Sequence, residues 1–419
     1  FVSVPGMVLT SQMTYLQVCL GFILGYLAVA FVLLPVYYRL NLTSIYTYLG
    51  QRLGRRSYLT GSWFFMLSKM LGAAIKFYVA CIILQQMVLQ SMGVPFAMTV
   101  AVLVSLIWLY TRRGGVNTLV FTDSFQTMCL FTALLLIIYK VVEQMAQADG
   151  MTIHNLVTAV AGDGRSRIFV MDDWLSTHNF WKQLISGAFI VVVMTGLDQD
   201  MMQKNLTCRT LREAQKDMCC YGVAFVPANL LFLTLGVLLA QLFERQGVAL
   251  PASGDELLPM FVALSGTLVA VLFTIGIVAA SFSSADSALT SLTTCYCVDI
   301  CDNQGDERLR KRSHAAMCLL FMLFILAFHT LNSRSLIDAI YTLVSYTYGP
   351  LLGLYAFGLF TRRQVREQWV PAVCLASPVV CYAIDRMSQH AWNYHFGYEL
   401  LMLNGLLTFL GLWLATKHE

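Results

Sequence analysis

The chain has 419 residues, of which 58% are hydrophobic and 12% are charged, and its formal net charge at pH 7 is +4. Soluble domains carry about 25% charged residues, so this composition excludes an ordinary water-soluble protein and indicates an integral membrane protein. A net charge this small gives no reason to expect a nucleic-acid partner. The expected partner surface is instead a lipid bilayer.

Apolar runs of about 20 residues, the length that crosses a bilayer as a helix, recur along the whole chain. We expect about eleven spans in a single transmembrane domain, 1–419. The predicted spans are 15–38, 58–91, 95–111, 118–142, 180–201, 214–243, 265–301, 314–331, 336–360, 368–386 and 397–416. The opening segment 1–10 is apolar but too short to cross and contains a Pro-Gly break. We therefore expect an N-terminal half-helix and a truncated N-terminus.

Positive charges in the connections are distributed unevenly between the two sides of this map. One side holds basic runs such as Arg55-Arg56, Arg112-Arg113 and 308–312, whereas the other holds few basic residues, Arg165 and Arg167 among them. Because Lys and Arg concentrate in cytoplasmic loops, we expect the basic side and the C-terminus to be cytoplasmic. The expected location is the plasma (inner) membrane, as a multi-pass protein.

Spans 1–142 and 180–360 then run in opposite directions through the membrane. Inverted repeats of five helices are a recurrent transporter architecture, in which solute and ions bind at the midplane where helices break. We therefore expect an all-α protein with a first repeat over about 1–142 and a second over about 180–360. Extra helices follow at 368–416, and the polar segment 143–179 lies between the repeats.

Motifs for catalysis are absent from the sequence. It contains no phosphate-binding loop, no nucleophile-elbow motif and no His/Cys set with zinc spacing; the tightest cysteine group, Cys295, Cys297 and Cys301, is spaced poorly for zinc. We expect that the protein is not an enzyme.

The stretch "SFSSADSALTS", residues 281–291, places hydroxyl groups and a carboxylate inside an apolar span. Ala280, Ser283, Ser284 and Ser287 follow at helical spacing and so share one face. A carbonyl and hydroxyl oxygens form a neutral set that can bind and release sodium, although serines also bond to their own helix or pack against a neighbour. Asp286 favours the functional alternative, because a carboxylate inside a membrane is expensive and marks ion pathways.

Other ionisable residues also lie within predicted spans. Asp123 is a candidate ligand or an interfacial helix cap. Lys69 and Lys76 lie seven residues apart on one helix face; Lys69 is expected to extend toward the interface. Lys76 is deeper and needs either a structural carboxylate partner or an anionic ligand. Asp198 and Asp200, at the end of a span before a basic loop, are expected to cap a helix and form cytoplasmic salt bridges.

Several segments resemble the sodium/solute symporter family, and together they cover nearly the whole chain in the expected order. They are "FVSVPGM", "SIYTYLGQRLGRR", "VFTDSFQ", "GLDQDMMQKNL", "AASFSSADSALTS" and "SYTYGPLLGLYAFGLF". The resemblance implies a LeuT-type fold and solute uptake driven by sodium. The pattern is most similar to members of the sialic acid transporter type.

The resemblance also implies roles for particular residues. It places Ala280, Ser283 and Ser284 at a first sodium ion, with the other ligands preceding Phe1. A second sodium is implied at Asp123, Ser283 and Ser287, and Asp286 stands where similar members have serine, so it joins this candidate set. Lys76 stands where such members have an arginine that holds the substrate carboxylate.

The resemblance to sugar-transporting members fails on the sixth core helix. Their aromatic and Asn residues there are replaced by Val191, Met194 and Thr195. We therefore expect symport of a small polar solute, in the class of carboxylated sugars such as sialic acid. Symport of a neutral sugar or an amino acid, a symporter-like sensor domain without transport, and a leak channel are the alternatives. The absence of a cytoplasmic domain after Glu419 argues against the sensor.

Overall fold

The computed structural model describes residues 2–40, 44–85, 89, 92–111, 116–149, 153–303, 305–331 and 336–416. Within helices, the side chains of residues 110, 116–125, 147–149, 153, 154, 156, 331 and 336–339 lie outside this description. The described chain is all-α, with one isolated antiparallel bridge between Val365 and Thr416. This agrees with the fold class expected from the sequence.

The first half of the chain forms ten helices of very different length. They are α1 (Ser3–Gly6), α2 (Val8–Ser11), α3 (Tyr15–Ala28), α4 (Leu34–Leu40), α5 (Thr47–Leu53), α6 (Arg55–Leu84), α7 (Phe96–Thr111), α8 (Val116–Asp149), α9 (Ile153–Ala161) and α10 (Phe180–Val191). A π-helical turn, Val29–Leu33, joins α3 to α4 without a break, and another, Val192–Gly196, extends α10. A 3-10 turn, Gly164–Ser166, follows α9.

The second half continues with helices α11 to α19. They are α11 (Gln199–Asn205), α12 (Leu211–Arg245), α13 (Leu257–Leu264), α14 (Thr267–Cys295), α15 (Glu307–Leu331), α16 (Leu336–Thr347), α17 (Gly349–Phe360), α18 (Val370–Trp392) and α19 (Leu400–Leu414). A π-helical turn, Tyr296–Ile300, extends α14. Short 3-10 turns, Gly254–Glu256 and Glu367–Trp369, precede α13 and α18.

The predicted spans correspond to these helices in order. Within the described residues, seven helices are long and apolar enough to cross a membrane, or nine if each of two bent pairs counts as one span. The two remaining predicted spans, 95–111 and 397–416, are shorter apolar helices. The apolar opening segment, described from residue 2, forms two short helices, α1 and α2, where the sequence predicted one half-helix. The division of the chain into two repeats stays a prediction.

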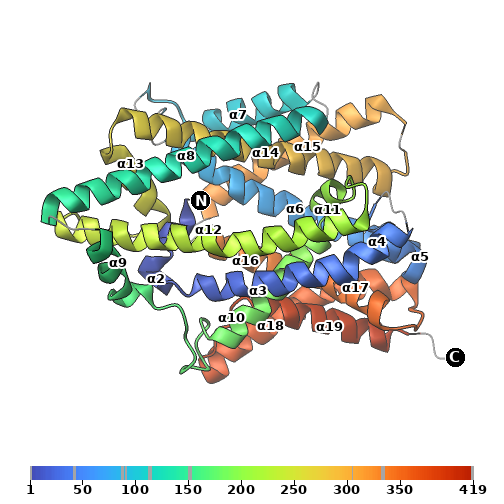
Figure 1. The fold of residues 1–419 in the computed structure, drawn as a ribbon. Coiled ribbons are helices and arrows are strands. Elements are labelled where there is room, and N and C mark those ends of the chain that lie inside the picture. Colours follow the sequence, from blue (N-terminus) through green and yellow to red (C-terminus); the bar gives the residue numbers. More distant parts are fainter. Residues whose placement is uncertain are drawn as a thin grey trace.

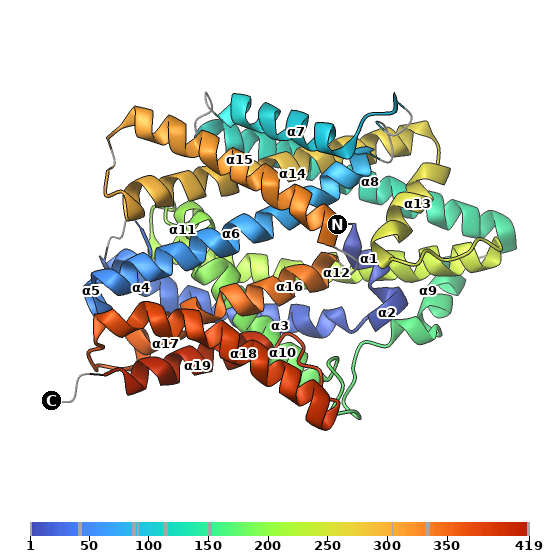
Figure 2. The ribbon, with the colours of Figure 1, turned by 180° about the vertical axis from the view of Figure 1, so that it is seen from behind.

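The long helices run side by side and form a bundle (Figures 1 and 2). Helices α7, α8, α14 and α15 gather on one side of the bundle, and α10, α17, α18 and α19 gather on the other. Helices α3, α6, α12 and α16 lie between the two groups in both views. This arrangement encloses a central region that helices from both halves of the chain surround.

Two spans are broken, and the local sequence explains both breaks. Helix α11 bends by 73° from the α10 segment after Gly196, where Asp198 caps the new helix by accepting from the backbone N–H groups of Asp200 and Met201. Helix α17 bends by 45° from α16 at a Gly-Pro pair, where Pro350 lacks the N–H that would continue the ladder. Broken helices leave backbone groups free to face a cavity.

Small residues let α3 and α10 approach closely. A Cβ added at Gly21 would collide with the Leu184 carbonyl, and one added at Gly187 would collide with the Val18 carbonyl. Because hydrophobic burial does not drive helices together in lipid, contacts between small residues provide close van der Waals packing. These glycines therefore fix the crossing that holds α3 beside the broken span.

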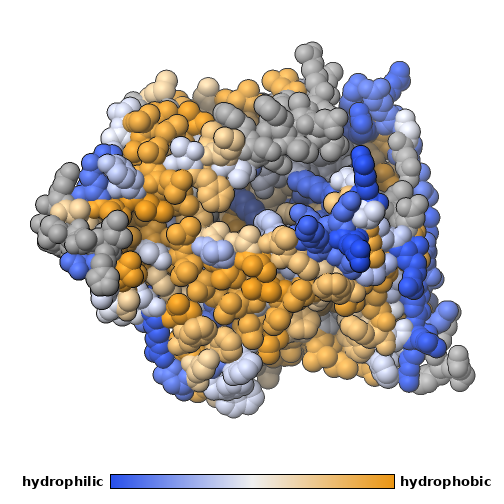
Figure 3. All heavy atoms as spheres, viewed as in Figure 1, coloured by the Kyte–Doolittle hydropathy of each residue, from blue (hydrophilic) through white to orange (hydrophobic). Residues whose placement is uncertain are grey.

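The outer surface of the bundle has an apolar belt and a polar end. In Figure 3, apolar side chains cover the middle of the face over α3 and α12, and hydrophilic side chains gather at the end where α4 and α5 lie. The exposed apolar residues on these helices include Leu24, Phe31, Val223 and Leu231. A broad apolar belt with a polar end is the surface of a membrane protein.

Candidate functional site

A cavity of about 820 Å³ lies at the centre of the bundle. It is lined by residues of α3, α6, α8, α11, α12, α14 and α16, together with the extended α10 segment. The two broken spans therefore both contribute to its wall. Figure 3 shows a hollow with hydrophilic atoms between α12 and the group of helices that contains α14.

One face of α14 lines this cavity. Ala280, Ser283, Ser284 and Ser287 are all lining residues, which is the set that the helical spacing predicted. Ser284 is exposed to the cavity, whereas Ser287 is buried and its hydroxyl donates to Asp200 Oδ1 at 2.6 Å. Neutral hydroxyl oxygens are suited to a monovalent cation, and the role of these residues as sodium ligands stays a prediction.

Asp286 lies on the flank of the same helix, about 100° around the axis from Ser287. It is not among the described lining residues of the cavity. Its carboxylate is 4% exposed, accepts a hydrogen bond of 3.3 Å from Thr290 and lies near Cys318 of α15. Buried carboxylates are held by such contacts. Its proposed place at a second sodium stays a prediction.

Asp123 lies on α8, in the stretch whose side chains are outside the described residues. The next described residues of this helix, Gln126 and Thr127, line the central cavity. The backbone of α8 therefore borders the cavity close to position 123. The predicted role of Asp123 as a sodium ligand is not decided by the geometry.

Lys69 forms a buried ion-pair cluster, which the sequence analysis did not predict. Its Nζ lies 3.0 Å from Asp198 Oδ2 and 2.9 Å from Asp200 Oδ2, and the three side chains are 5–12% exposed. The Tyr348 hydroxyl at the α16–α17 break also donates to Asp198 Oδ2, at 3.1 Å. Burial of two carboxylates is compensated by this pairing.

Two of the sequence expectations change as a result. Lys69 does not extend toward the interface: burial beside two carboxylates holds its ammonium inside the bundle. Asp198 does cap a helix, as expected, and both carboxylates pair with Lys69 of α6, while Asp200 also pairs with the basic segment that follows it. Lys204 of that segment lies 3.9 Å from Asp200. No sequence signal links positions 69 and 198, because they lie 129 residues apart.

Lys76 lies two helical turns beyond Lys69 on the same face of α6 and also lines the central cavity. Its side chain is exposed to that space. Within the described part of the chain, Lys76 makes no hydrogen bond or ion pair. The structure thus separates the two lysines, one matched by carboxylates and the other presented to the cavity.

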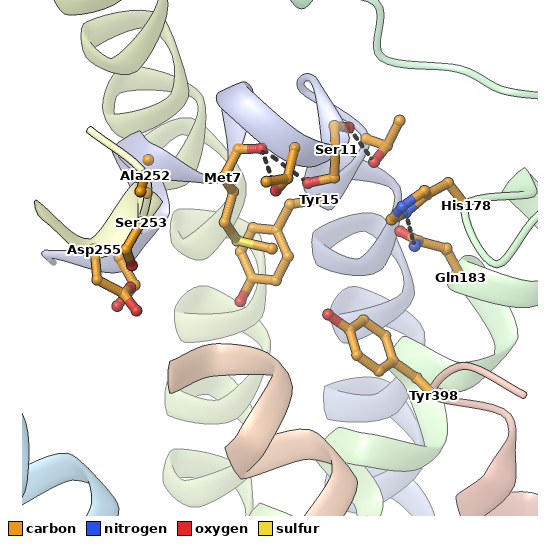
Figure 4. Close-up of a pocket in the computed structure, with 14 residues that line it drawn as sticks. Met7, Ser11, Tyr15, His178, Gln183, Ala252, Ser253, Asp255 and Tyr398 are labelled. Atoms are coloured by element: carbon orange, nitrogen blue, oxygen red, sulfur yellow. Dashed lines mark hydrogen bonds between the residues drawn. The ribbon is translucent and has the colours of Figure 1, made fainter. Parts of the chain in front are cut away.

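A second cavity of about 240 Å³ lies beyond the central one (Figure 4). Its wall includes Ser11, His178, Asp255, Tyr15 and Tyr398. Tyr15 lines both cavities, and its hydroxyl lies 2.9 Å from that of Tyr341, whose ring contacts the Tyr398 ring. Figure 4 shows the Tyr398 hydroxyl pointing toward Tyr15. Tyr15 therefore lies where the two cavities meet, while Tyr341 lines the central cavity and Tyr398 lines the second.

Comparison with known proteins places this architecture in a family. The sodium:solute symporter family model matches residues 1–368. The chain belongs to this family. A solved substrate-bound, outward-open Na+-coupled sialic acid symporter superposes on all of this chain and on 90% of its own, with a TM-score of 0.74 and 19% sequence identity. This likeness shows that the fold is of the LeuT type.

Two curated relatives cover most of the chain. The sodium-dependent multivitamin transporter of Oryctolagus cuniculus is 26% identical over 84% of this chain and 55% of its own length. The sodium/sialic acid symporter SiaT of Proteus mirabilis is 26% identical over 87% of this chain and 74% of its own length. The chain thus spans about half of the first relative and about three quarters of the second.

Proposed function

We propose that this protein is a sodium-coupled symporter of a small polar solute that carries a carboxylate. The observation that carries the proposal is the central cavity itself, where the hydroxyl face of α14 and the Lys76 ammonium line one space between two broken spans. Neutral oxygen ligands suit a monovalent cation that must be released again, and an ammonium suits an anion. Membership in the sodium:solute symporter family supports the cation as sodium.

The proposed solute class follows from Lys76. Lys69 already has two carboxylates, so the positive charge of Lys76 is available to an anionic solute. An ammonium placed in a membrane cavity is stabilised when a carboxylate occupies the same space. The relative SiaT, named as a sodium/sialic acid symporter, supports a sugar acid as the first solute to test.

We further propose that the chain lies in the plasma (inner) membrane with its C-terminus in the cytoplasm. The support is the excess of Lys and Arg on one side of the map. On that side lie α4, α5 and the segment where α11 ends and α12 begins, with Lys204 in the last turn of α11, Arg209 in the connection and Arg212 in the first turn of α12. Transport then runs from the second cavity, past the tyrosines, toward the basic side.

The test is uptake of labelled sialic acid, with labelled glucose as a neutral comparison, by the protein in liposomes. An inward sodium gradient should drive sialic acid uptake. Ser283→Ala or Ser284→Ala should raise the sodium concentration for half-maximal uptake by about 10- to 100-fold, because a lost ligand costs about 1–3 kcal/mol. The matched control is Ser281→Ala, on the same helix but outside the lining set. Uptake without any sodium dependence would contradict the proposal, as would an unchanged sodium requirement in both variants.

A further inference from the structure

Ser287 donates its hydroxyl hydrogen to a carboxylate of another helix, whereas many hydroxyl residues of the spans donate within their own helix. Many of those donate to the carbonyl four residues earlier in their own helix; examples are Ser57, Ser62, Ser68, Thr132, Thr274, Ser345 and Thr347. Ser287 instead donates to Asp200 Oδ1 of α11, at 2.6 Å. The contact joins the cation face of α14 to the broken span.

The hydrogen bond to Asp200 determines how well the Ser287 oxygen can act as a cation ligand. A hydroxyl has one hydrogen and two lone pairs, so a hydrogen directed at Asp200 leaves the lone pairs directed away from that carboxylate. A carboxylate acceptor also makes a shorter and stronger bond than a carbonyl does, which increases the negative charge on the serine oxygen. Both effects improve Ser287 as a cation ligand.

Asp200 is held in place by several contacts of its own. Lys69 contacts its Oδ2 at 2.9 Å, while Oδ1 accepts from Ser287. Its backbone N–H donates to Asp198 Oδ1, so the cap of α11 fixes the main chain at this point. The carboxylate is therefore oriented from both ends, and it lines the same cavity as Ser283, Ser284 and Ser287.

We propose that Asp200 is a positioning residue for the cation site: it orients and polarises the Ser287 hydroxyl without contacting the cation. The inference rests on the proposed sodium coupling and goes beyond it, because it assigns the control of one ligand to the broken span. Groups that orient the ligands of a metal typically change its affinity by about 10- to 100-fold when they are removed.

Cation binding is thereby coupled to the position of α11 against α14. The Ser287 hydroxyl reaches Asp200 only while α11 lies against α14, so a cation that needs this hydroxyl binds more tightly in that arrangement. A ligand shifts an equilibrium by its differential affinity for the two states. Sodium therefore stabilises the contact of α11 with α14, and Lys69 and Tyr348 transmit this preference to α6 and to the α16–α17 break.

The experiment measures sodium binding to the full chain in detergent, by the binding of radioactive sodium, so that it does not depend on transport. Asp200→Asn keeps an acceptor oxygen but removes the charge, and it should weaken sodium binding by about 10-fold or more. Asp200→Glu keeps the charge but displaces it, and it should weaken binding less. The matched control, Asp217→Asn, changes an exposed carboxylate of α12 and should bind sodium as the wild type does.

A double-mutant cycle separates positioning from a general structural role. If Asp200 acts through Ser287, the loss from Asp200→Asn should nearly disappear in a Ser287→Ala background, because the two residues form one contact. Independent losses that add would overturn the inference, as would wild-type affinity in Asp200→Asn. If Asp200→Asn does not fold, wild-type affinity in Asp200→Glu overturns it and weakened affinity supports it.

The same measurement distinguishes this inference from the proposed function. A wild-type protein that binds no sodium contradicts the symport proposal, and the positioning role fails with it. A wild-type protein that binds sodium with an affinity insensitive to Asp200 contradicts the positioning role alone.

Discussion

At the scale of single residues, two lysines on one helix face differ in whether a carboxylate lies within ion-pair distance. Lys69 and Lys76 have the same chemistry and both line the central cavity, but the carboxylates of α11 reach only the first. A buried ammonium in a structural pair contributes to packing and is costly to unpair. An ammonium facing a cavity is available to a solute.

Lys76→Gln should therefore abolish binding of sialic acid and leave sodium binding unchanged. The glutamine keeps most of the side-chain length but loses the charge that attracts a carboxylate. Lys76→Arg should retain binding, because a guanidinium makes a bidentate contact with a carboxylate. Binding of labelled sialic acid and of sodium to the same detergent samples checks both results. Normal sialic acid binding by Lys76→Gln would return a neutral solute to favour.

A second residue-scale prediction concerns pH. Arg165, in the connection after α9, donates to both oxygens of Asp163 and also pairs with Glu244 of α12. The hydrogen bonds from Arg165 lower the pKa of Asp163 from 3.8 to about 2. Because the folded pKa is the lower one, this pair contributes its full stability above about pH 4 and loses it as pH falls toward 2.

Asp163→Asn should accordingly lower the thermal unfolding temperature at pH 7, and the difference from the wild type should shrink as the pH falls from 4 toward 2. Unfolding in detergent at pH 7, 4 and 3 measures this. A difference that stays constant over this range would show that Asp163 does not titrate as an ion-paired carboxylate.

At the scale of elements, the break between α16 and α17 depends on a helix outside the predicted repeats. Asn404 of α19 is fully buried, and its Nδ2 donates to the carbonyls of Ser345 and Tyr346 at 2.9 and 3.0 Å. Carbonyls released by a helix break cannot be left unpaired in a membrane. The extra helix therefore stabilises the bend beside which Tyr341 and Tyr348 line the central cavity.

Asn404→Ala should destabilise the protein by about 2–6 kcal/mol, because two buried carbonyls lose their donor and each unsatisfied acceptor costs about 1–3 kcal/mol. The free energy of unfolding in detergent measures the loss. Ser377→Ala is the matched control, since the Ser377 hydroxyl bonds to Asn404 without contacting those carbonyls, and its effect should be smaller. Equal losses in the two variants would contradict the role assigned to the amide donor.

At the scale of the whole molecule, we expect the two cavities, which share Tyr15 in their walls, to be successive parts of one transport path. Tyr15 comes from α3 and Tyr341 from α16, 326 residues later. Their hydroxyl contact at 2.9 Å joins a helix near the start of the chain to a broken span near its end. Separation of α3 from α16 would connect the second cavity to the central one.

Tyr341→Phe should make the central cavity reachable from the second cavity about 2- to 10-fold more often, the effect of losing a hydrogen bond worth about 0.5–1.5 kcal/mol. The measurement is the rate at which an impermeant thiol reagent labels Gly72→Cys in liposomes, relative to the parent with its native cysteines. A side chain at position 72 would meet open space. Tyr346→Phe, on the same helix, is the control, and equal labelling rates in the two variants would contradict the barrier.

The class of protein, the order of the spans and the hydroxyl face of α14 could be predicted before any tertiary contact was known. Each of these depends on local periodicity, since an apolar run of sufficient length must cross the bilayer and residues three and four apart must share a helix face. The resemblance to the sodium/solute symporter family added the fold, which the structural likeness confirmed.

Only the tertiary structure decided which polar groups meet. The sequence placed Asp198 and Asp200 at a cytoplasmic loop, and the 73° break turned them inward to Lys69 and Ser287. It gave no sign that Tyr15 would contact Tyr341, or that Asn404 would hold the α16–α17 bend. These pairings join residues far apart in the chain, and their geometry depends on where helices break and cross, which no local pattern specifies.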